Sequence, residues 1–380
     1  MRIVIKLAIL LLECIYFILK RLPQKDKILY ISRQGDDIPV DFQLLAECMK
    51  QRYPEFQNIF LCKMIQGGVK SKLGYCFHMC RQMYHLATAK AVVLDGYCIL
   101  ACVLTHRANL VIIQMWHALG ALKKFGYSIL DRPEGKSSKI AKTMKMHNNY
   151  SFVFTSGDLC KQYFAEAFNQ PIDKVKVFPL PRVDLLLDEE HKKKIAKSIY
   201  DRYPQLKNTE KKILVYTPTF RENSSGLKDN LEKLIEKIDY KRYELIVKLH
   251  PLSDIRIYDS RIITDKNFSA TDMLVIADYV ITDYSAIIFE ALLLDKPIAL
   301  FAFDYKDYCI NRDFYLDYES CFNTIICPNI EQLFSKLQKN EEYDFTSFRE
   351  FIKKIVRNTE STYTGEICEF IYENIKQNEK

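Results

Sequence analysis

Short apolar segments rich in β-branched residues alternate along this chain with longer amphipathic segments, and this alternation predicts strands separated by helices. The first series of predicted strands comprises Lys27–Ser32, Asn58–Lys63, Ala91–Leu94, Leu110–Gln114, Ser151–Phe154 and Val175–Phe178. The second series comprises Lys212–Thr217, Glu244–Lys248, Arg261–Thr264, Tyr279–Thr282, Pro297–Phe301 and Thr324–Cys327. Strands that alternate with helices form parallel sheets covered on both faces, so the pattern predicts an α/β fold.

The two series are separated by residues 188–208, a segment rich in lysine and acidic residues across which few apolar contacts can form. A chain of 380 residues exceeds the usual size of one domain. We therefore predict two doubly wound Rossmann-like domains, residues 23–190 and 205–345, with helices over residues 346–380. Two such domains would face each other across a cleft at the carboxyl ends of their strands, where ligands of these sheets bind.

The first twenty residues form an apolar segment, Ile3–Leu19, that is interrupted only by Lys6 and Glu13. A signal peptide would need a small-residue cleavage site, but here lysine and arginine follow the apolar core. A membrane-spanning helix would need about 20 apolar residues without internal charges. Neither interpretation fits well, and two others are left: a helix lying in the membrane surface, or a helix packed on its own domain.

The surface interpretation follows from helical geometry, because the charged residues fall within about 40° of one another around a helix. They are Arg2, Lys6, Glu13 and Lys20, and Arg21 adds a further cation directly after Lys20. A narrow charged stripe on an apolar helix is typical of interfacial helices, and basic residues near a membrane surface attract anionic lipid. We predict that residues 1–22 bind the surface of a membrane.

The amino-acid composition excludes several classes of protein. Hydrophobic residues make up 48% and charged residues 27%, which excludes a disordered chain, and the net charge of +7 is small for a nucleic-acid-binding protein. The sequence contains neither a G-x-G-x-x-G nor a P-loop motif. Its 12 cysteines include no C-x-x-C pair, which favours a reducing compartment over a disulfide or zinc framework. We expect no cofactor and no metal site, because the Asp-x-Asp pair that would hold Mg²⁺ is also missing.

Two histidines directly follow predicted strands, where side chains of a doubly wound sheet face the ligand. His117 follows the strand that ends at Gln114, beside the only tryptophan of the chain, and His250 follows Lys248. Imidazole titrates near neutral pH, so each histidine can act as a base or as a donor to phosphate. Each could equally be a loop residue with a purely structural hydrogen bond.

In the second half, the strand Tyr279–Thr282 is followed at once by a predicted helix. Such a helix start offers free backbone N–H groups that bind phosphate without a glycine loop. Thr282, Asp283, Ser285 and Ala286 form this junction, although Asp283 or Ser285 could merely cap the helix. Glu290, further along the same helix, is a candidate for binding a ribose hydroxyl.

Arg221 lies after the strand that begins at Lys212, and Lys248 lies on the neighbouring predicted strand. A guanidinium group at a strand end can hold a phosphate through two parallel hydrogen bonds. Arg221, His250 and the helix amides would then neutralise the charge of a leaving phosphate, which is electrostatic stabilisation without a metal.

Several of these segments, taken in order, resemble the motifs of the CDP-glycerol glycerophosphotransferase family of teichoic-acid enzymes. The matching segments are Gln114–His117 with Leu122–Gly126, Phe154–Ser156, Pro179–Asp184, Tyr216–Arg221, Lys248–Pro251, and Ile276–Asp278 with Ile281–Ser285. The resemblance implies a GT-B-like fold and transfer of glycerol phosphate from CDP-glycerol to a lipid-linked acceptor, with release of CMP. It also implies a peripheral protein on the cytoplasmic face of the membrane. From the small net charge we expect no nucleic-acid partner.

The family motifs also imply roles for individual residues. His117 resembles the proposed base toward the acceptor hydroxyl, and His250 resembles the histidine at the donor phosphates. Arg221, Thr282 and Ser285 resemble donor pyrophosphate contacts, and Arg182 and Asp184 stand in a motif expected to contact substrate. Because the two histidines come from opposite domains, domain closure would assemble the site.

The sequence departs from the common family pattern after His117, where Ala118-Leu119-Gly120 replaces Gly-Thr-Pro. This change resembles the primase branch, which adds the first unit to a disaccharide on undecaprenyl diphosphate. A polymerase, a ribitol-phosphate transferase, a sugar-nucleotide glycosyltransferase and an inactive membrane-bound assembly subunit are the alternatives. The chain could also form an oligomer.

Overall fold

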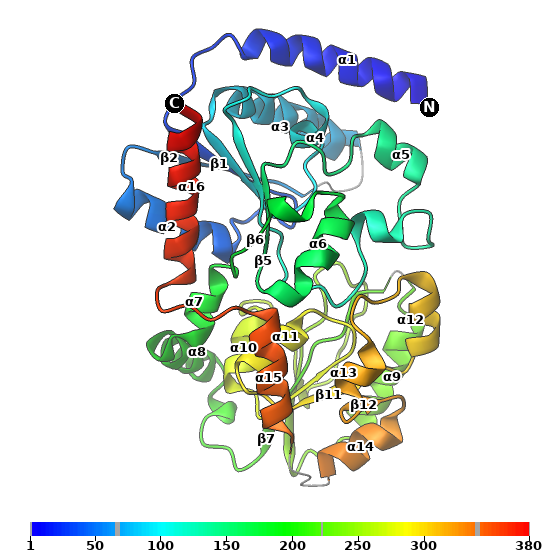
Figure 1. Ribbon diagram of the computed structural model, residues 1–380. Helices are drawn as coiled ribbons and strands as arrows, with labels where there is room; N and C mark the ends of the chain where they lie inside the picture. Colours follow the sequence, from blue (N-terminus) through cyan, green and yellow to red (C-terminus); the bar gives the residue numbers. More distant parts are fainter. Residues whose placement is uncertain (1, 65–68, 222, 339–342, 380) are drawn as a thin grey trace. The chain divides into compact units, whose positions relative to one another are not determined.

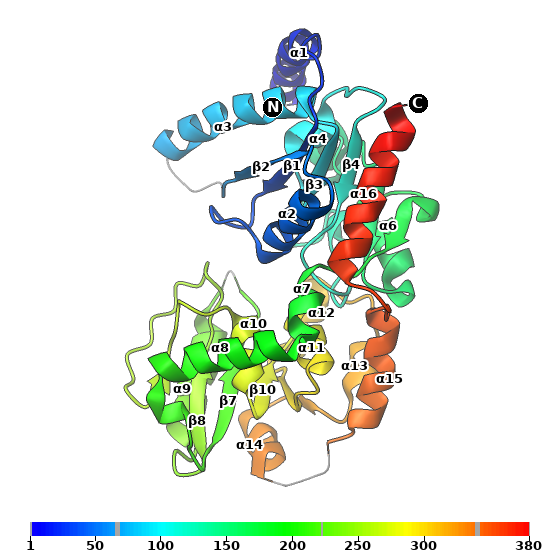
Figure 2. The ribbon, with the colours of Figure 1, turned by 90° about the vertical axis from the view of Figure 1, so that its left-hand side faces the viewer.

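The computed structural model describes residues 2–64, 69–221, 223–338 and 343–379, apart from the side chains of Arg2 and of residues 69–73. The chain folds into two compact units (Figures 1 and 2). Unit 1 consists of residues 1–119, 125–184 and 356–380, and unit 2 consists of residues 120–124 and 185–355. Each unit contains one six-stranded sheet among the described residues.

In unit 1 the strands pair in the order β2-β1-β3-β4-β5-β6, and all pairs are parallel. The strands are β1 (Lys27–Ser32), β2 (Gln57–Cys62), β3 (Ala91–Leu94), β4 (Val111–Gln114), β5 (Phe152–Thr155) and β6 (Val175–Val177). The helices are α1 (Arg2–Leu19), α2 (Val40–Arg52), α3 (Val69–Thr88), α4 (Ile99–Val103), α5 (Ser138–Thr143), α6 (Lys161–Phe168) and α16 (Tyr363–Glu379), with 3-10 turns at Gly126–Ile129, Asp158–Cys160 and Ile172–Lys174. Every residue of β1, β3 and β4 is buried, as the unbroken apolar segments predict for a sheet covered on both faces.

In unit 2 the order is β12-β11-β10-β7-β8-β9, again with parallel pairs. The strands are β7 (Lys212–Tyr216), β8 (Tyr243–Val247), β9 (Ile262–Ile263), β10 (Tyr279–Thr282), β11 (Ile298–Phe301) and β12 (Ile326–Cys327). The helices are α8 (Glu189–Arg202), α9 (Ser225–Lys237), α10 (Ala270–Ile276), α11 (Ile287–Leu293), α12 (Tyr305–Asn311), α13 (Tyr318–Phe322), α14 (Ile330–Gln338) and α15 (Phe345–Ile355), with a 3-10 turn at Pro204–Leu206; α7 (Arg182–Leu187) begins in unit 1 and ends in unit 2.

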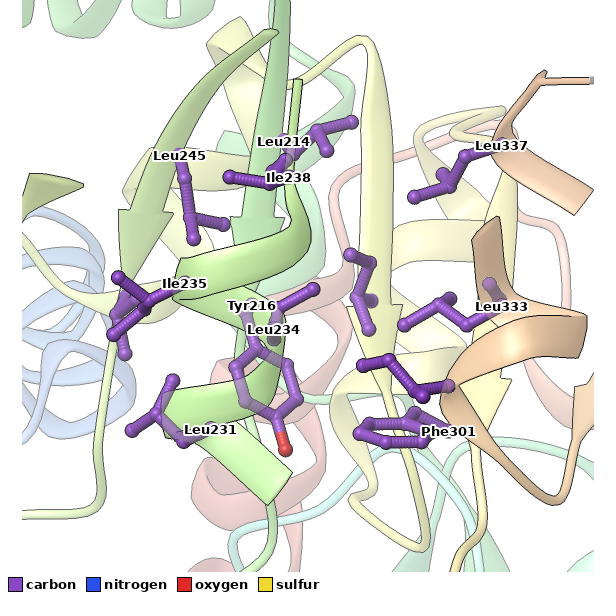
Figure 3. Packing of buried hydrophobic residues seen from close by; sticks show 14 of the residues in the cluster. Leu214, Tyr216, Leu231, Leu234, Ile235, Ile238, Leu245, Phe301, Leu333 and Leu337 are labelled. Atoms are coloured by element: carbon purple, nitrogen blue, oxygen red, sulfur yellow. The ribbon is translucent and has the colours of Figure 1, made fainter. Parts of the chain in front are cut away.

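The core of unit 2 lies between the sheet and helices α9 and α14 (Figure 3). Leu214 and Tyr216 of β7 are fully buried there, together with Leu234 of α9 and Leu333 of α14. The helix residues recur at helical spacing and the strand residues at every second position, so each element presents one apolar side to the other.

Each strand predicted from the sequence is present, with ends that differ by at most two residues. The α/β fold with two parallel sheets is therefore confirmed. The C-terminal helices do not form one segment, however, because α15 belongs to unit 2 and α16 to unit 1. α16 packs against α2, where Tyr372 stacks on Tyr53 with ring centres 4.0 Å apart. The chain thus returns to its first unit at its end.

Asp184 caps the N-terminal end of α16. Its carboxylate accepts hydrogen bonds from the backbone N–H groups of Tyr363 and Thr364, each at 2.9 Å, and from the hydroxyl of Thr364 at 2.5 Å. These N–H groups have no partner within the helix, so Asp184 satisfies them from a distant part of the sequence. The structure therefore gives Asp184 a structural role, and its predicted contact with substrate stays a prediction.

Helix α1 contacts α3, which it crosses at a steep angle (Figures 1 and 2), and it packs on unit 1 with one side only. Tyr16 is fully buried, and its hydroxyl lies 2.8 Å from Nδ1 of His106. Glu13 accepts hydrogen bonds from the backbone and hydroxyl of Thr105, and Lys20 donates to the carbonyl of Thr105. Two members of the predicted charged stripe therefore face the protein itself.

The other side of α1 is apolar and exposed. It carries Ile3, Val4, Leu7, Leu10, Leu11, Ile15, Phe17 and Ile18. Lys6 and Arg21 are exposed as well, and the guanidinium group of Arg21 lies over the Phe17 ring. The side chain of Arg2 lies outside the described residues. Among the helices that the structure describes, none is long and apolar enough to cross a membrane.

Candidate functional site

Each sheet has one point at which the strand order reverses, and ligands of doubly wound sheets bind at the carboxyl ends of the strands there. In unit 1 this point lies between β1 and β3, and in unit 2 between β7 and β10. A cavity of about 230 Å³ opens at this position in unit 1. It is lined by Gln34, Pro39, Asp41, Phe42, Asp95, His117 and Arg182.

His117 reaches this cavity from the turn after β4. The preceding residue, Trp116, adopts a φ of +63°, an unusual value for a bulky residue, and its ring stacks on Phe125 with centres 4.7 Å apart. Trp116 also packs against the His117 ring, at 4.1 Å between centres. The strained turn and the stack together fix the direction of the imidazole.

The tautomer of His117 follows from its hydrogen bond. Nδ1 lies 2.6 Å from the backbone carbonyl of Asp95, and since a carbonyl only accepts, Nδ1 must carry the hydrogen. The amide group of Gln34 lies 3.3 Å from the same nitrogen. Burial lowers the pKa of His117 to about 4, so the ring is neutral at neutral pH. Nε2 is therefore left with a free lone pair.

Asp41 and Arg182 form the charged pair of the cavity. The Asp41 carboxylate accepts hydrogen bonds from the backbone N–H and from Nε of Arg182, at 2.8 and 2.9 Å, and a further bond from Nη2. The Asp41 side chain is almost fully buried, so the pair is well shielded from water. Arg182, predicted as a substrate contact, thus lines the cavity but already holds a carboxylate.

Asp95 contributes a carboxyl group that the sequence analysis missed. Its side chain is 3% exposed, and neither carboxylate oxygen has a hydrogen-bond partner of normal geometry among the described residues. Burial raises the pKa of Asp95 to about 6; the nearby Ser32 hydroxyl opposes this shift although no well-formed hydrogen bond joins the two side chains. Asp95 directly follows β3, so the strand-end rule that selected His117 would have found it.

In unit 2, Arg221 follows β7 and is held by two carboxylates. Its Nε and Nη2 donate to the two oxygens of Asp304 at 2.6 and 2.9 Å, and Nη1 lies 2.8 Å from Asp283. The Arg221 side chain is 9% exposed, and these carboxylates raise its pKa despite its burial. The two parallel hydrogen bonds expected to hold a phosphate are made to Asp304 here, so donor contact by Arg221 stays a prediction.

The junction after β10 is more irregular than a direct strand-to-helix turn. Thr282 is fully buried and donates its hydroxyl to the carbonyl of Thr217 at 2.7 Å. Asp283 accepts from the backbone N–H groups of Thr219 and Tyr284. Helix α11 begins only at Ile287, after Ser285 and Ala286. The hydroxyl of Thr282 and the carboxylate of Asp283 therefore stabilise the loops.

Two other candidates are also held within unit 2. Lys248 donates to the carbonyls of Asp265 and Phe268, both at 2.5 Å, and burial lowers its pKa. Glu290 lies on α11 and is buried, not exposed. The predicted contacts of Lys248 and Glu290 with a nucleotide therefore stay predictions.

His250 lies in the turn after β8, with its ring 5.3 Å from that of Phe220. Its Nδ1 accepts a hydrogen bond from the backbone N–H of Leu252 at 3.2 Å, so the hydrogen of the neutral ring is on Nε2. Although the ring is exposed, partial burial and the ammonium group of Lys123 lower its pKa. His250 is therefore a neutral donor at Nε2, whereas His117 is a neutral acceptor at Nε2.

No group of three or more metal-ligating side chains is suitably placed within the part of the chain that the structure describes. The two cysteine pairs with C-x-x-x-C spacing lie in different environments: Cys76 and Cys80 are exposed, whereas Cys98 and Cys102 are buried.

Comparison with known proteins identifies the family. The family model for CDP-glycerol:poly(glycerophosphate) glycerophosphotransferases matches residues 14–373. The chain belongs to this family. The resemblance predicted from the ordered motifs is confirmed, and the protein is an enzyme of the phosphotransferase class with a CDP-glycerol-type nucleotide as its donor.

Curated relatives of this phosphotransferase extend over most of its length. It is 31% identical to a teichoic acid ribitol-phosphate primase of Bacillus spizizenii, over 92% of this chain and 91% of the relative. It is 28% identical to a teichoic acid glycerol-phosphate primase of Bacillus subtilis, over 80% and 83%. A teichoic acid poly(ribitol-phosphate) polymerase of Bacillus spizizenii is 31% identical, over 92% of this chain and 57% of the relative.

The fold of this phosphotransferase is similar to that of a solved wall teichoic acid polymerase, TagF. The two share 18% sequence identity with a TM-score of 0.75, over 94% of this chain and 91% of the solved chain. At this identity the likeness concerns the fold alone, and it confirms the predicted GT-B-like architecture.

Proposed function

We propose that this enzyme acts in teichoic acid synthesis, where it transfers glycerol phosphate from CDP-glycerol to a hydroxyl of a lipid-linked glycan and releases CMP. The observation that carries the proposal is the opposite hydrogen placement on the two histidines. His117 presents a lone pair at Nε2, and His250 presents an N–H at Nε2. A phosphoryl transfer to an alcohol needs one acceptor for the alcohol proton and donors for the phosphate oxygens.

The reaction balances with these groups. The acceptor hydroxyl gives its proton to Nε2 of His117 while its oxygen forms a bond to the phosphorus that carries glycerol. The bond from that phosphorus to the oxygen of CMP breaks, and CMP leaves with the electron pair. Donors from unit 2, which we take to be Nε2 of His250 and the backbone around Ser285, stabilise the charge on the phosphates. Positioning and charge neutralisation, not covalent catalysis, would provide most of the rate.

The primase role is supported by the relatives. Similarity to a ribitol-phosphate primase and a glycerol-phosphate primase covers most of both chains in each case. The same comparison supplies a second candidate for the donor, because one of these two primases is a ribitol-phosphate primase. CDP-ribitol is therefore the alternative to CDP-glycerol.

We further propose that the enzyme works at a membrane surface through α1. The helix buries Tyr16 against unit 1 and exposes an opposite side made of leucine, isoleucine and phenylalanine. Exposed apolar patches of this kind are typical of interaction sites, and the exposed cations Lys6 and Arg21 favour an anionic surface. A lipid-linked acceptor would be presented at such a surface.

The test is CMP release by the full chain with a lipid-linked disaccharide acceptor and either CDP-glycerol or CDP-ribitol. We expect one donor to be used at least about tenfold faster and His117→Ala to lower turnover by about 10²–10⁴. His191→Ala, on α8, is the matched control and should keep full activity. Full activity of His117→Ala would refute the role of the base, and products longer than one unit would refute the primase role.

A further inference from the structure

The cavity of unit 1 contains a carboxylate that the transfer chemistry does not use. Asp95 lines the cavity, is 3% exposed, and has no well-formed hydrogen bond to either oxygen within the described part of the chain. Buried carboxylates in proteins are almost always hydrogen-bonded, because an unmet acceptor loses its solvation without compensation. A carboxylate that lines a cavity and has no well-formed hydrogen bond among the described residues therefore points to hydrogen-bond donors on a ligand.

The charges around the cavity restrict that ligand. Asp41 is neutralised by Arg182 through three hydrogen bonds, and His117 is neutral at neutral pH. Gln34, Pro39 and Phe42 complete the lining without charge. When Asp95 is ionised, the cavity carries a net charge of about −1, and a second anion would be repelled at short range. The ligand portion bound here is neutral and rich in O–H donors.

The backbone of Asp95 also orients the imidazole of His117, the proposed base. Its backbone carbonyl accepts from Nδ1 of His117 at 2.6 Å, so the carboxylate and the imidazole are anchored at one residue and line one cavity. A ligand with two neighbouring hydroxyls can place one on Nε2 of His117 and donate the other to Asp95. Such a ligand would be oriented by Asp95 before its first hydroxyl reacts.

We propose that Asp95 recognises the acceptor, and that the cavity of unit 1 binds a neutral polyol or sugar terminus through a hydroxyl next to the reacting one. This inference rests on the proposed function and specifies the chemistry of its acceptor. The same negative charge keeps the donor phosphates away from Asp95, and only the phosphorus that carries glycerol has to reach the hydroxyl held at Nε2 of His117. Asp95 is thus a specificity-determining residue, and His117 remains the base.

The first experiment measures ligand binding to the wild-type protein and needs a variant only to assign a signal. Imidazole resonances of the full chain are recorded by NMR while glycerol or glycerol 3-phosphate is added, with His117 assigned by loss of its signal in His117→Ala. We expect glycerol to shift the His117 resonances in a saturable way and glycerol 3-phosphate at equal concentration to shift them at least fivefold less. An equal or larger response to glycerol 3-phosphate would overturn the proposal, whether or not turnover has been observed.

The second experiment separates recognition from folding. In Asp95→Asn we expect the KM for the acceptor to rise at least tenfold, while the KM for the nucleotide donor stays within twofold. The preference for glycerol over glycerol 3-phosphate in the NMR titration should also disappear, because the repelling charge is gone. Asp173→Asn, an exposed carboxylate of the same unit, is the control and should change neither quantity. An unchanged acceptor KM in a folded Asp95→Asn protein would overturn the proposal.

If the wild-type enzyme releases no CMP with any acceptor, the proposed function fails while the NMR titration still tests the cavity. If CMP is released but the titration shows no preference for the neutral polyol, the function stands and the assignment of Asp95 fails.

Discussion

Asp95→Asn should stabilise unit 1 at neutral pH, although it weakens acceptor binding. The pKa of Asp95 is raised from 3.8 to about 6 in the folded protein, with burial as the main cause. The folded protein therefore holds this proton to higher pH than the unfolded chain. Below pH 3.8 the carboxyl group is protonated in both states and does not lower the free energy of unfolding. As the pH rises toward about 6 this advantage is lost, and above that pH the folded protein bears the full cost of the buried charge.

The size of the effect follows from the shift. The folded and unfolded pKa values differ by about two, which corresponds to roughly 3 kcal/mol of folding free energy. Removing the charge can increase the stability by at most this amount. Asparagine keeps a buried polar group without partners, at a cost of about 1 kcal/mol or more. We expect a net stabilisation of about 1–2 kcal/mol at about pH 7.5, or an increase in Tm of about 2–8 °C for a unit of this size.

The chain offers a specific probe for this measurement. Trp116 is the only tryptophan in the sequence and lies in unit 1 beside His117, so its fluorescence reports the unfolding of that unit. Thermal unfolding is compared for wild type and Asp95→Asn at about pH 7.5 and about pH 4. At about pH 4 the carboxyl group is protonated in the folded state, so the stabilisation should be absent and at most the small cost of the asparagine should remain. Destabilisation of equal size at both pH values would refute the reasoning, because it would show that Asp95 makes a structural hydrogen bond.

Two further predictions concern unit 2 and helix α1. Arg221→Met should destabilise unit 2 by about 3–5 kcal/mol in chemical denaturation, because it leaves two shielded carboxylates without their cation. The control Arg349→Met breaks an exposed ion pair and should cost less than about 1 kcal/mol. Equal losses of stability in the two variants would contradict this prediction. Leu7 and Leu11 are 59% and 63% exposed, and replacing both with glutamate should abolish co-sedimentation with anionic vesicles without changing the Tm. The control Ile172→Glu, elsewhere on unit 1, should still co-sediment. Vesicle binding that survives the double substitution would exclude α1 as the membrane contact.

Much of the fold could be predicted from the sequence because a parallel sheet covered on both faces needs unbroken apolar strands. Ala91–Leu94 is buried at every position, and its bounds are those that the pattern predicts. Such segments are local signals, and they need no knowledge of distant residues. The same rule placed His117 and His250 at strand ends, which identifies the candidate histidines before any contact is known.

The partners of the charged residues could not be predicted from the sequence. Arg221 meets Asp304, 83 positions away, and Arg182 meets Asp41, 141 positions away. No local pattern encodes these pairs, because crossover connections bring the carboxyl ends of the strands together only in the folded sheet. The two arginines that the sequence predicts as substrate contacts are therefore bound to carboxylates of the protein.

The family, the two parallel sheets and the positions of both histidines follow from local patterns in the amino-acid order. Which nitrogen of each imidazole carries its hydrogen depends on folding, since Asp95 and Leu252 supply the backbone partners. The folded chain also determines that α16 returns to unit 1 and that the buried carboxylate of Asp95 has no well-formed hydrogen bond among the described residues. These features depend on contacts between strand ends, and such contacts arise only when the chain is folded.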